Sequence, residues 1–369
     1  MIKTIWGDKL MSDSKNNTPA GGAPDFDRDA FGRRFREVMD ASEGKDALSK
    51  NGPETNDGGE EKKPQRKKKK KHVFRNILLI LLALILVFTG TAVGAAFYAT
   101  SGYKSITLEK NEYVKASDLM HAPGVTNILL MGIDTKDTAA KTRSDSMILL
   151  SIDTLHRELK LTSFMRDMYV EVPGYGGTKL THACAYEGPQ LTVDTIELNF
   201  GIKIDAYCKV GYKLFVDLVN GIGGITVPEI DETESWALAK EGVDIAPGKN
   251  VHLNGHQALN YCRIRKGQSD FQRTERQREA LSIIIKQAVK TNPFKLMKLA
   301  KKLLAKVECS IDKTEFISLF FKALPCLFSD IGQQQIPADG TWSSGTRDGL
   351  SVLLVDMEAN KQILKEFIY

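Results

Sequence analysis

One apolar segment dominates the hydrophobic pattern of the chain, because no charged residue occurs between positions 77 and 98. A helix of that length spans about 30 Å, the thickness of the hydrocarbon core of a bilayer. Nine lysines and arginines, without one acid, lie just before it at 62–75, and such a basic block keeps its end of a membrane helix in the cytoplasm. The pattern predicts a single transmembrane helix over 73–99, with the rest of the chain outside the cell. A cleaved signal peptide has a shorter leader and a shorter apolar run.

The chain differs in composition on the two sides of this segment. Residues 1–72 are rich in Gly, Asp, Glu, Asn, Ser and Pro, which predicts a disordered, basic cytoplasmic tail. Within it, 26–39 carries apolar residues at helical spacing, which fits a docking helix or a transient helix without function. Anionic lipid headgroups account for the lysine block, and a nucleic-acid arm is the alternative. Residues 100–125 are predicted to be an extracellular stalk and 126–369 one folded domain.

The folded domain alternates between strand and helix patterns. Nearly continuous apolar runs at 127–133 and 146–152 are typical of strands that are buried on both faces. Further strands are predicted at 159–164, 169–172, 205–210, 225–228 and 351–354. Helices are predicted at 190–199, 213–220, 254–261, 274–290, 294–306, 312–324 and 358–367. The pattern indicates an α/β fold with helices on both faces of a central sheet.

The segment 262–278, CRIRKGQSDFQRTERQR, holds more cations than acids. Its cations are Arg263, Arg265, Lys266, Arg273, Arg276 and Arg278, and its acids are Asp270 and Glu275. In the helix pattern that follows, at about 100° per residue, Arg273 and Gln277 fall on the core-facing side with Ile284. A buried guanidinium needs an anionic partner, so we infer that a ligand supplies an anion. A solvated, arginine-rich helix start is the simpler alternative.

Acids and arginines also follow the ends of the predicted strands. Asp134 ends the first strand and Asp145 begins the second, so antiparallel pairing puts both at one end of the sheet. The third strand returns and delivers Arg166 and Asp167 to that end, and Arg143 lies beside Asp145. A carboxylate pair beside arginines suits Mg²⁺ and phosphate groups. Turn and helix-cap chemistry is the alternative explanation of the two acids.

The five cysteines indicate neither a zinc site nor a disulfide framework, because their number is odd and no CxxC motif occurs. They are Cys184, Cys208, Cys262, Cys309 and Cys326. Buried thiols are the expected state, with a bridge between Cys309 and Cys326 as the alternative.

Five segments in order resemble one known family over 127–286. They are NILLMGID, TRSDSMILLSI, SFMRDMYVEVPG, TKLTHACAYEGP and LNGHQALNYCRIRKGQSDFQRTERQR. The chain thereby resembles the LytR-CpsA-Psr proteins of Gram-positive cell envelopes, and its tail, single span and external domain fit them too. Met165, Thr181 and Gln272 depart from the family's pattern, whereas the charged positions are kept.

The resemblance implies a membrane-anchored phosphotransferase that moves an anionic glycopolymer from a polyprenyl-pyrophosphate carrier onto peptidoglycan. It implies a mixed, largely antiparallel central sheet. The expected catalytic residues are Arg166, Arg263, Arg265 and Asp270. The expected substrate-binding residues are Arg143, Asp167, Lys179, Arg273 and Gln277. Asp134 and Asp145 are expected to hold Mg²⁺ or Mn²⁺.

The expected partners are the lipid-linked glycan, peptidoglycan and membrane lipids, without nucleic acid. Two alternatives share the same anion site: a non-catalytic lipid or glycan binder that regulates the envelope, and a polyprenyl-pyrophosphate phosphatase that uses water as acceptor. A membrane-tethered transcription regulator that uses the lysine block on DNA is a third alternative.

Overall fold

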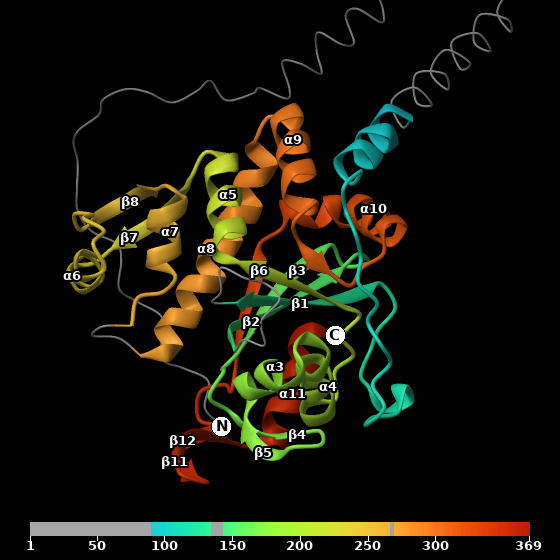
Figure 1. Ribbon diagram of the computed structural model, residues 1–369, viewed down its shortest axis with the longest axis vertical. Coiled ribbons are helices and arrows are strands. Elements are labelled where there is room, and N and C mark those ends of the chain that lie inside the picture. Colours follow the sequence, from blue (N-terminus) through green and yellow to red (C-terminus); the bar gives the residue numbers. More distant parts are fainter. Residues whose placement is uncertain (1–89, 134–142, 266–268) are drawn as a thin grey trace, which may run out of the picture. The chain divides into compact units, whose positions relative to one another are not determined.

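A six-stranded sheet in the order β10–β3–β2–β1–β6–β9 forms the centre of the domain (Figure 1). The computed structural model describes residues 90–133, 143–265 and 269–369. The strands are β1 (Val125–Ile133), β2 (Ser144–Asp153), β3 (Glu158–Phe164), β6 (Ala206–Gly211), β9 (Glu308–Cys309) and β10 (Ile331–Ile336). The predicted antiparallel meander of the first three strands is confirmed. β6 and β10 run parallel to β1 and β3, so the sheet is mixed.

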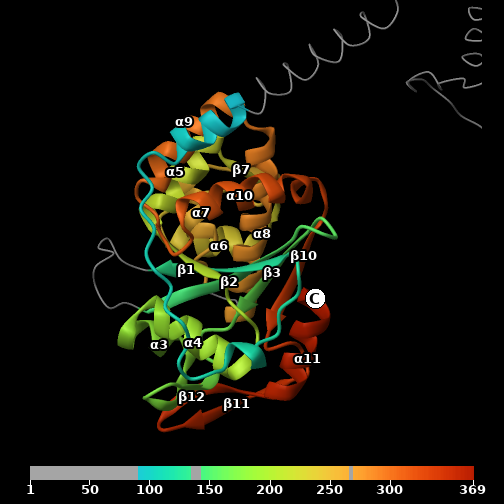
Figure 2. The same ribbon diagram turned by 90° about the vertical axis from the view of Figure 1, so that its right-hand side faces the viewer.

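Both faces of the sheet are apolar, which explains the continuous hydrophobic runs in the sequence. Leu129 pairs with Leu149 and contributes to one face, whereas Ile128 pairs with Leu150 and contributes to the other. The first face is covered by α3 (Leu180–Glu187), α4 (Pro189–Phe200) and α11 (Met357–Ile368). The second is covered by α8 (Asp270–Lys290), α9 (Pro293–Leu304) and α10 (Lys313–Ala323) (Figure 2). The predicted helices on both faces are confirmed.

A smaller layer packs on the outer side of α8 and has its own hydrophobic cluster. It consists of α5 (Tyr212–Ile222), β7 (Ile225–Ile230), α6 (Glu232–Lys240), β8 (Gly248–Leu253) and α7 (Gly255–Tyr261). Its α7 begins at a capping box in which Asn254 and Gln257 exchange hydrogen bonds, as the Asn-x-x-Gln spacing favours. This layer positions the end of α7, where the arginine-rich segment begins.

Helix α8 begins four residues before its predicted start. Ser269 accepts a hydrogen bond from the backbone of Gln272, whose side chain returns one, so a capping box fixes Asp270 as the first helical residue. The prediction began at Thr274 because the polar first turn carries no hydrophobic periodicity. The shift puts Asp270 one turn before Arg273 on the same helix.

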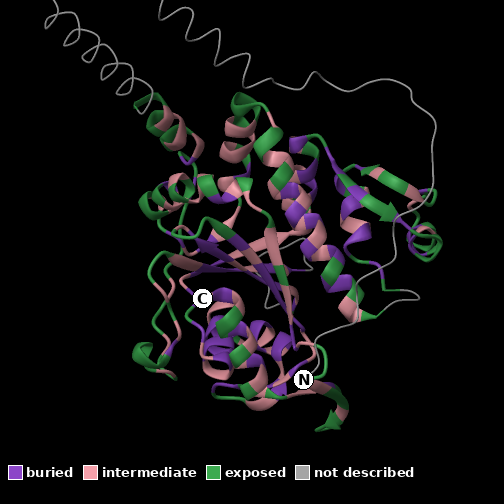
Figure 3. Ribbon diagram, turned by 180° about the vertical axis from the view of Figure 1, so that it is seen from behind, coloured by how far each residue is buried: buried purple, intermediate pink, exposed green. Residues whose placement is uncertain are grey.

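Short hairpins and 3-10 turns complete the domain. They are β4 (Tyr169–Val172) with β5 (Gly176–Lys179), β11 (Trp342–Arg347) with β12 (Leu350–Val355), η1 (Ala116–Asp118) and η2 (Leu324–Phe328). Buried residues gather on the central strands and on the helices below them, whereas β11 is largely exposed and β12 is mostly half-buried (Figure 3). The hairpin of β4 and β5 follows Arg166 and Asp167 in the chain and leads directly into α3.

The segment before the sheet is helical at 90–99. Residues 100–125, predicted as a stalk, lie along the domain, where Tyr103 and Leu119 are buried. Across the described ranges, none of the helices has the length and apolar character that a membrane crossing requires. The predicted tail at 1–72 and positions 73–89 of the predicted span lie outside the described residues.

A disulfide joins Cys208 of β6 to Cys309 of β9, two residues that pair across the strands. The expected free thiols are therefore found only for Cys184, Cys262 and Cys326, which are buried. A Cys309–Cys326 bridge is wrong, because strand pairing brings a different partner to Cys309. Sequence spacing gave no sign of this pairing, since the two cysteines are 101 residues apart.

We expect the double variant Cys208→Ser, Cys309→Ser to lose about 2–5 kcal/mol of unfolding free energy, because the bridge closes a long loop in the unfolded chain. Urea denaturation of wild type and variant measures the loss. A reductant should destabilise the wild type by a similar amount and leave the variant unchanged. Alkylation of all five cysteines in the non-reduced protein contradicts the bridge.

Candidate active site

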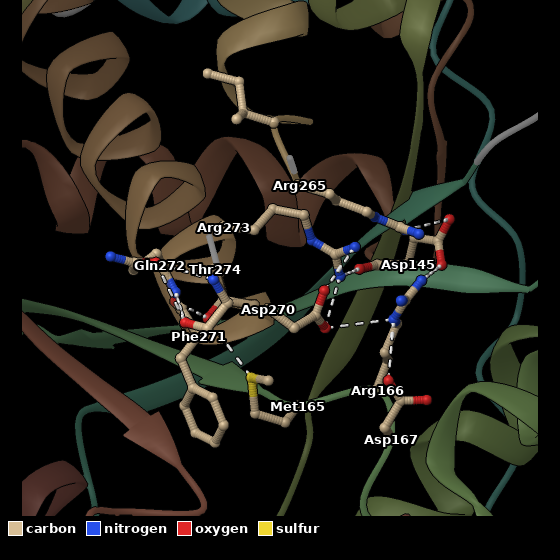
Figure 4. Close-up of polar contacts among 12 residues, drawn as sticks. Asp145, Met165, Arg166, Asp167, Arg265, Asp270, Phe271, Gln272, Arg273 and Thr274 are labelled. Atoms are coloured by element: carbon tan, nitrogen blue, oxygen red, sulfur yellow. Dashed lines mark hydrogen bonds and ion pairs between the residues drawn. The ribbon is translucent and has the colours of Figure 1, made fainter. Parts of the chain in front are cut away.

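The rim of the sheet brings Asp145 and Arg166 together, as the meander predicted. Asp145 is the second residue of β2, and Arg166 follows the end of the antiparallel strand β3. The Arg166 Nη1 atom donates to Asp145 Oδ1 over 2.6 Å (Figure 4). Asp134, the other predicted metal ligand, lies outside the described residues.

Helix α8 adds a second acid and a buried arginine to this rim. Asp270 Oδ1 lies 2.9 Å from Nη1 of Arg273, and Asp270 Oδ2 lies 3.3 Å from Nε of Arg166. The side chain of Arg273 is 2% exposed, so the predicted inward direction is confirmed. Its Nη2 also donates to the backbone carbonyl of Asp145 over 3.1 Å. Asp270 therefore links two arginines from different elements.

A second ion pair extends the cluster toward α3. Lys179 Nζ donates to Asp167 Oδ1 over 2.8 Å, and Asp167 Oδ2 lies 3.5 Å from Nε of Arg166. Lys179 is the last residue of β5 and the N-cap residue of α3. Both residues were predicted to bind substrate, and in the structure they flank Arg166.

Three further arginines surround the cluster from exposed positions. Arg265 is 53% exposed and its Nη2 lies 3.8 Å from Asp145 Oδ2. The guanidinium of Arg263 lies over the ring of Tyr212, 4.6 Å from its centroid. Arg143 immediately precedes β2 and is exposed. Exposed guanidinium groups retain donors that a ligand can take without breaking a buried ion pair.

Arg276 has a structural role in place of the ligand-binding role that the charge count suggested. It pairs with Glu234 of α6 over 3.3 Å and donates to the backbone carbonyls of Tyr261 and Ile264. The anionic partner of this buried cation comes from a distant helix, which sequence spacing does not reveal. Arg276 thereby holds the segment that carries Arg263. Lys266 of the same charge cluster lies outside the described residues.

Burial and neighbouring carboxylates set the ionisation of the two central arginines. Burial lowers the pKa of Arg166, but Asp270, Asp145 and Asp167 outweigh it and leave that pKa raised. Burial lowers the pKa of Arg273 to about 10, although Asp270 opposes the shift. Both guanidinium groups are therefore charged at neutral pH.

Some buried polar atoms of this cluster lack hydrogen-bond partners among the described residues. They are Nε of Arg166, Nε of Arg273 and Oε1 of Gln277, whose amide nitrogen donates to the Cys262 carbonyl. Buried polar atoms are rarely left without partners in proteins. Nε of Arg273 fits a site that an anion completes, whereas Nε of Arg166 already lies 3.3 Å from Asp270 Oδ2 and 3.5 Å from Asp167 Oδ2.

A cavity of about 840 Å³ opens beside these groups. Its arginines are Arg143, Arg166, Arg263, Arg265 and Arg273, and its acids are Asp145 and Glu241. Its apolar wall includes Leu130, Ile148, Val210, Phe215, Leu259 and Leu281. A cavity lined by both arginines and an apolar wall fits an anionic group attached to a hydrocarbon chain. The apolar wall was missed from the sequence, because its residues come from six separate elements.

Of the two acids predicted to hold a divalent metal ion, the structure describes Asp145. Asp145 Oδ1 accepts from Arg166, whereas Oδ2 has Arg265 at 3.8 Å. Within the described part of the chain, no group of three metal-ligating side chains occurs. Mg²⁺ typically takes only one or two carboxylates and fills its shell with phosphate oxygens and water. Asp145 is therefore compatible with Mg²⁺ if Asp134 supplies the second ligand.

Comparison with known proteins gives relatives that are named as teichoic acid transferases or as regulatory proteins. A polyisoprenyl-teichoic acid–peptidoglycan teichoic acid transferase, TagU, of Enterococcus faecalis is 31% identical over 248 residues, which are 65% of this chain and 78% of the relative. Regulatory protein MsrR of Staphylococcus aureus is 28% identical over 66% of this chain and 75% of its own length. The solved structure of the LytR-CPS2A-psr family protein YwtF (TagT) with bound octaprenyl pyrophosphate lipid is 26% identical. It has a TM-score of 0.55 and covers 71% of this chain and 97% of that chain.

The family model described as the LytR_cpsA_psr family matches residues 92–368. That match covers most of the chain, including the sheet, the arginine cluster and the C-terminal helix. The resemblance inferred from five short motifs is thus confirmed over a much longer stretch than the motifs span. The chain belongs to the LytR-CpsA-Psr family.

Proposed function

We propose that this protein transfers an anionic glycopolymer from a polyprenyl-pyrophosphate carrier onto peptidoglycan. The observation that carries the proposal is the cavity, which joins five arginines to an apolar wall. A polyprenyl pyrophosphate has a charged pyrophosphate head, which matches the arginines, and a hydrocarbon tail, which matches the apolar wall. The relatives named for teichoic acid transfer, and the TagT structure with octaprenyl pyrophosphate, support the same ligand class.

The reaction exchanges one phosphorus–oxygen bond for another. A hydroxyl group of the acceptor glycan attacks the phosphorus that bears the polymer, and the bond to the bridging oxygen breaks. Polyprenyl phosphate leaves, and the hydroxyl proton passes to a carboxylate of the site or to solvent. Arg166 and Arg273 face the charge that develops on the bridging oxygen, and both side chains are largely shielded from water. Asp270 keeps both guanidinium groups in position.

The metal ion is a separate part of this proposal. Asp145, with Asp134 outside the described residues, would hold Mg²⁺ or Mn²⁺. When bound, the ion supplies positive charge to the phosphate oxygens of the lipid carrier. The arginines would bind the remaining oxygens, among them Arg265, whose Nη2 lies 3.8 Å from Asp145 Oδ2.

Membrane anchoring completes the proposal. The apolar segment 77–98 and its preceding basic block favour a single span with the domain on the outer side of a Gram-positive cell membrane. Lipid-linked donor and wall acceptor are both available on that side. Tethering the domain there raises the local concentration of the site relative to its lipid substrate.

We expect Arg263→Ala and Arg265→Ala each to lower the transfer rate about a hundredfold or more, because each removes a cation from the phosphate-binding end. Both side chains are exposed, so the fold should persist. The assay supplies full-length protein with lipid-linked glycan, peptidoglycan and Mg²⁺. Lys249→Ala, an exposed cation on β8 outside the cavity, serves as the control. Wild-type turnover in both arginine variants contradicts the assignment, and release of polymer without transfer identifies a phosphatase.

We expect Asp270→Asn to destabilise the fold by about 2–3 kcal/mol, less than for a fully buried pair because Asp270 keeps 22% exposure. The loss leaves Arg273 buried without its carboxylate. Chemical denaturation measures it, with Glu275→Gln on the exposed face of the same helix as the control, expected to change stability by less than about 0.5 kcal/mol. Equal effects of the two substitutions contradict a special role for Asp270.

We expect Asp145→Asn to weaken Mg²⁺ binding at least about tenfold, as loss of a supporting carboxylate usually does. Titration calorimetry of the full-length protein with Mg²⁺, in the presence of inorganic pyrophosphate, measures the affinity. Asp167→Asn should bind Mg²⁺ nearly as the wild type does, because Asp167 pairs with Lys179. Unchanged Mg²⁺ affinity in Asp145→Asn excludes Asp145 as a metal ligand. A non-catalytic binder, in contrast, would keep its function when Asp145 is replaced.

A further inference from the structure

A continuous line of contacts leads away from the arginine cluster along α3. It starts at Arg166, passes through Asp167 to Lys179, and continues on the helix that Lys179 caps. One turn on, His182 Nδ1 lies 2.8 Å from Thr178 Oγ1. The line lies apart from the apolar wall, because the cavity lining includes no residue of α3 or of the β4–β5 hairpin.

Three ring side chains follow the line outward. His182 and Tyr186 are four residues apart on α3 and therefore share a face, with ring centroids 5.9 Å apart. The ring of Tyr186 stacks on that of Tyr175 at 4.3 Å and 20°. His182 and Tyr186 are partly exposed, and Tyr175 is 48% exposed. We call His182, Tyr186 and Tyr175 the ring strip.

The turn between β4 and β5 displays Tyr175 on the surface. Gly174 and Gly176 flank it with φ of +76° and +74°, conformations that glycine adopts without steric cost. The Tyr175 backbone donates to the Val172 carbonyl and closes the turn. The ring of Tyr175 projects out of the hairpin and stacks on α3, so it does not fill a hydrophobic core.

Polar groups lie at the edges of the rings. The Tyr175 hydroxyl donates to Glu187 Oε1 over 2.9 Å. Burial, with Arg143 and Lys179, lowers the pKa of His182, so its ring is uncharged at neutral pH. The outer strip thus combines neutral aromatic faces with a carboxylate that accepts hydrogen bonds.

We propose that the ring strip is a sugar-binding subsite that holds a glycan chain next to the reacting phosphorus. The C–H faces of a pyranose ring stack on aromatic faces, while its hydroxyl groups donate to carboxylates such as Glu187. From Lys179 to Tyr186 the helix rises about 10 Å, the length of roughly two linked sugars. The subsite rests on the proposed function, since a glycan must approach the phosphate from the side away from the lipid.

The same sugar chemistry occurs in the donor polymer and in the acceptor glycan. The strip binds whichever chain lies beside Lys179 during transfer. The experiment therefore varies donor and acceptor separately and also measures binding without transfer.

The test compares Tyr175→Ala and Tyr186→Ala with Tyr175→Phe and Tyr186→Phe in the full-length protein. Each alanine variant should raise the KM for one glycan substrate roughly three- to tenfold with kcat nearly unchanged, because it removes one stacking partner. The phenylalanine variants keep the ring and should behave almost as the wild type does. Phe328→Ala, which removes an 81% exposed ring from η2, is the matched control.

A rise in the acceptor KM alone assigns the strip to peptidoglycan, and a rise in the donor KM alone assigns it to the polymer. Calorimetry with soluble peptidoglycan oligosaccharides and with carrier-free polymer repeats both comparisons without transfer. If the wild type binds sugars but transfers nothing, the proposed function is wrong, and the sugar-binding measurements still test the ring strip.

Unchanged KM and unchanged sugar affinity in Tyr175→Ala overturn the subsite. Tyr175 is exposed, so this variant should fold even if Tyr186→Ala does not.

Discussion

The structure of the site depends on keeping a charged guanidinium inside the protein. Arg273 is almost fully buried and is charged at neutral pH, which is costly unless anionic and carbonyl groups replace its water. Asp270 and the backbone carbonyl of Asp145 supply that replacement. Because Asp270 also lies against Arg166, the same acid ties helix α8 to the rim of the sheet. Removing any member leaves the others short of a partner.

This ion-pair network explains how one site presents two kinds of arginine. Arg273, which is buried, and Arg166, which is partly buried, are fixed by carboxylates. Arg263 and Arg265 lie on an exposed segment that Arg276 holds through backbone carbonyls. Fixed cations suit a charge that develops at one place during a reaction, whereas exposed cations suit capture of an incoming anion.

Arg166 has two kinds of surroundings, and they match the proposed substrates. Apolar residues of the sheet and its covering helices line the cavity. Outside that lining, a lysine, an uncharged histidine and two stacked tyrosines follow α3 outward. A lipid and a sugar chain joined through phosphates need these two separate environments next to the cations.

Local sequence patterns determined the features that depend on short-range geometry. Alternating strands with short turns placed Asp145 and Arg166 at one rim, and the helical repeat directed Arg273 inward, because both periods follow from backbone geometry. The polar strand β10, the disulfide and the Arg276–Glu234 pair were decided only by the tertiary structure. Each of these features joins segments that are far apart in the chain. Strand β10 has no apolar period, because its Gln335 accepts a hydrogen bond from Thr274 of α8 in place of packing an apolar side chain. Such contacts exist only once packing has brought the segments together, so no local pattern encodes them.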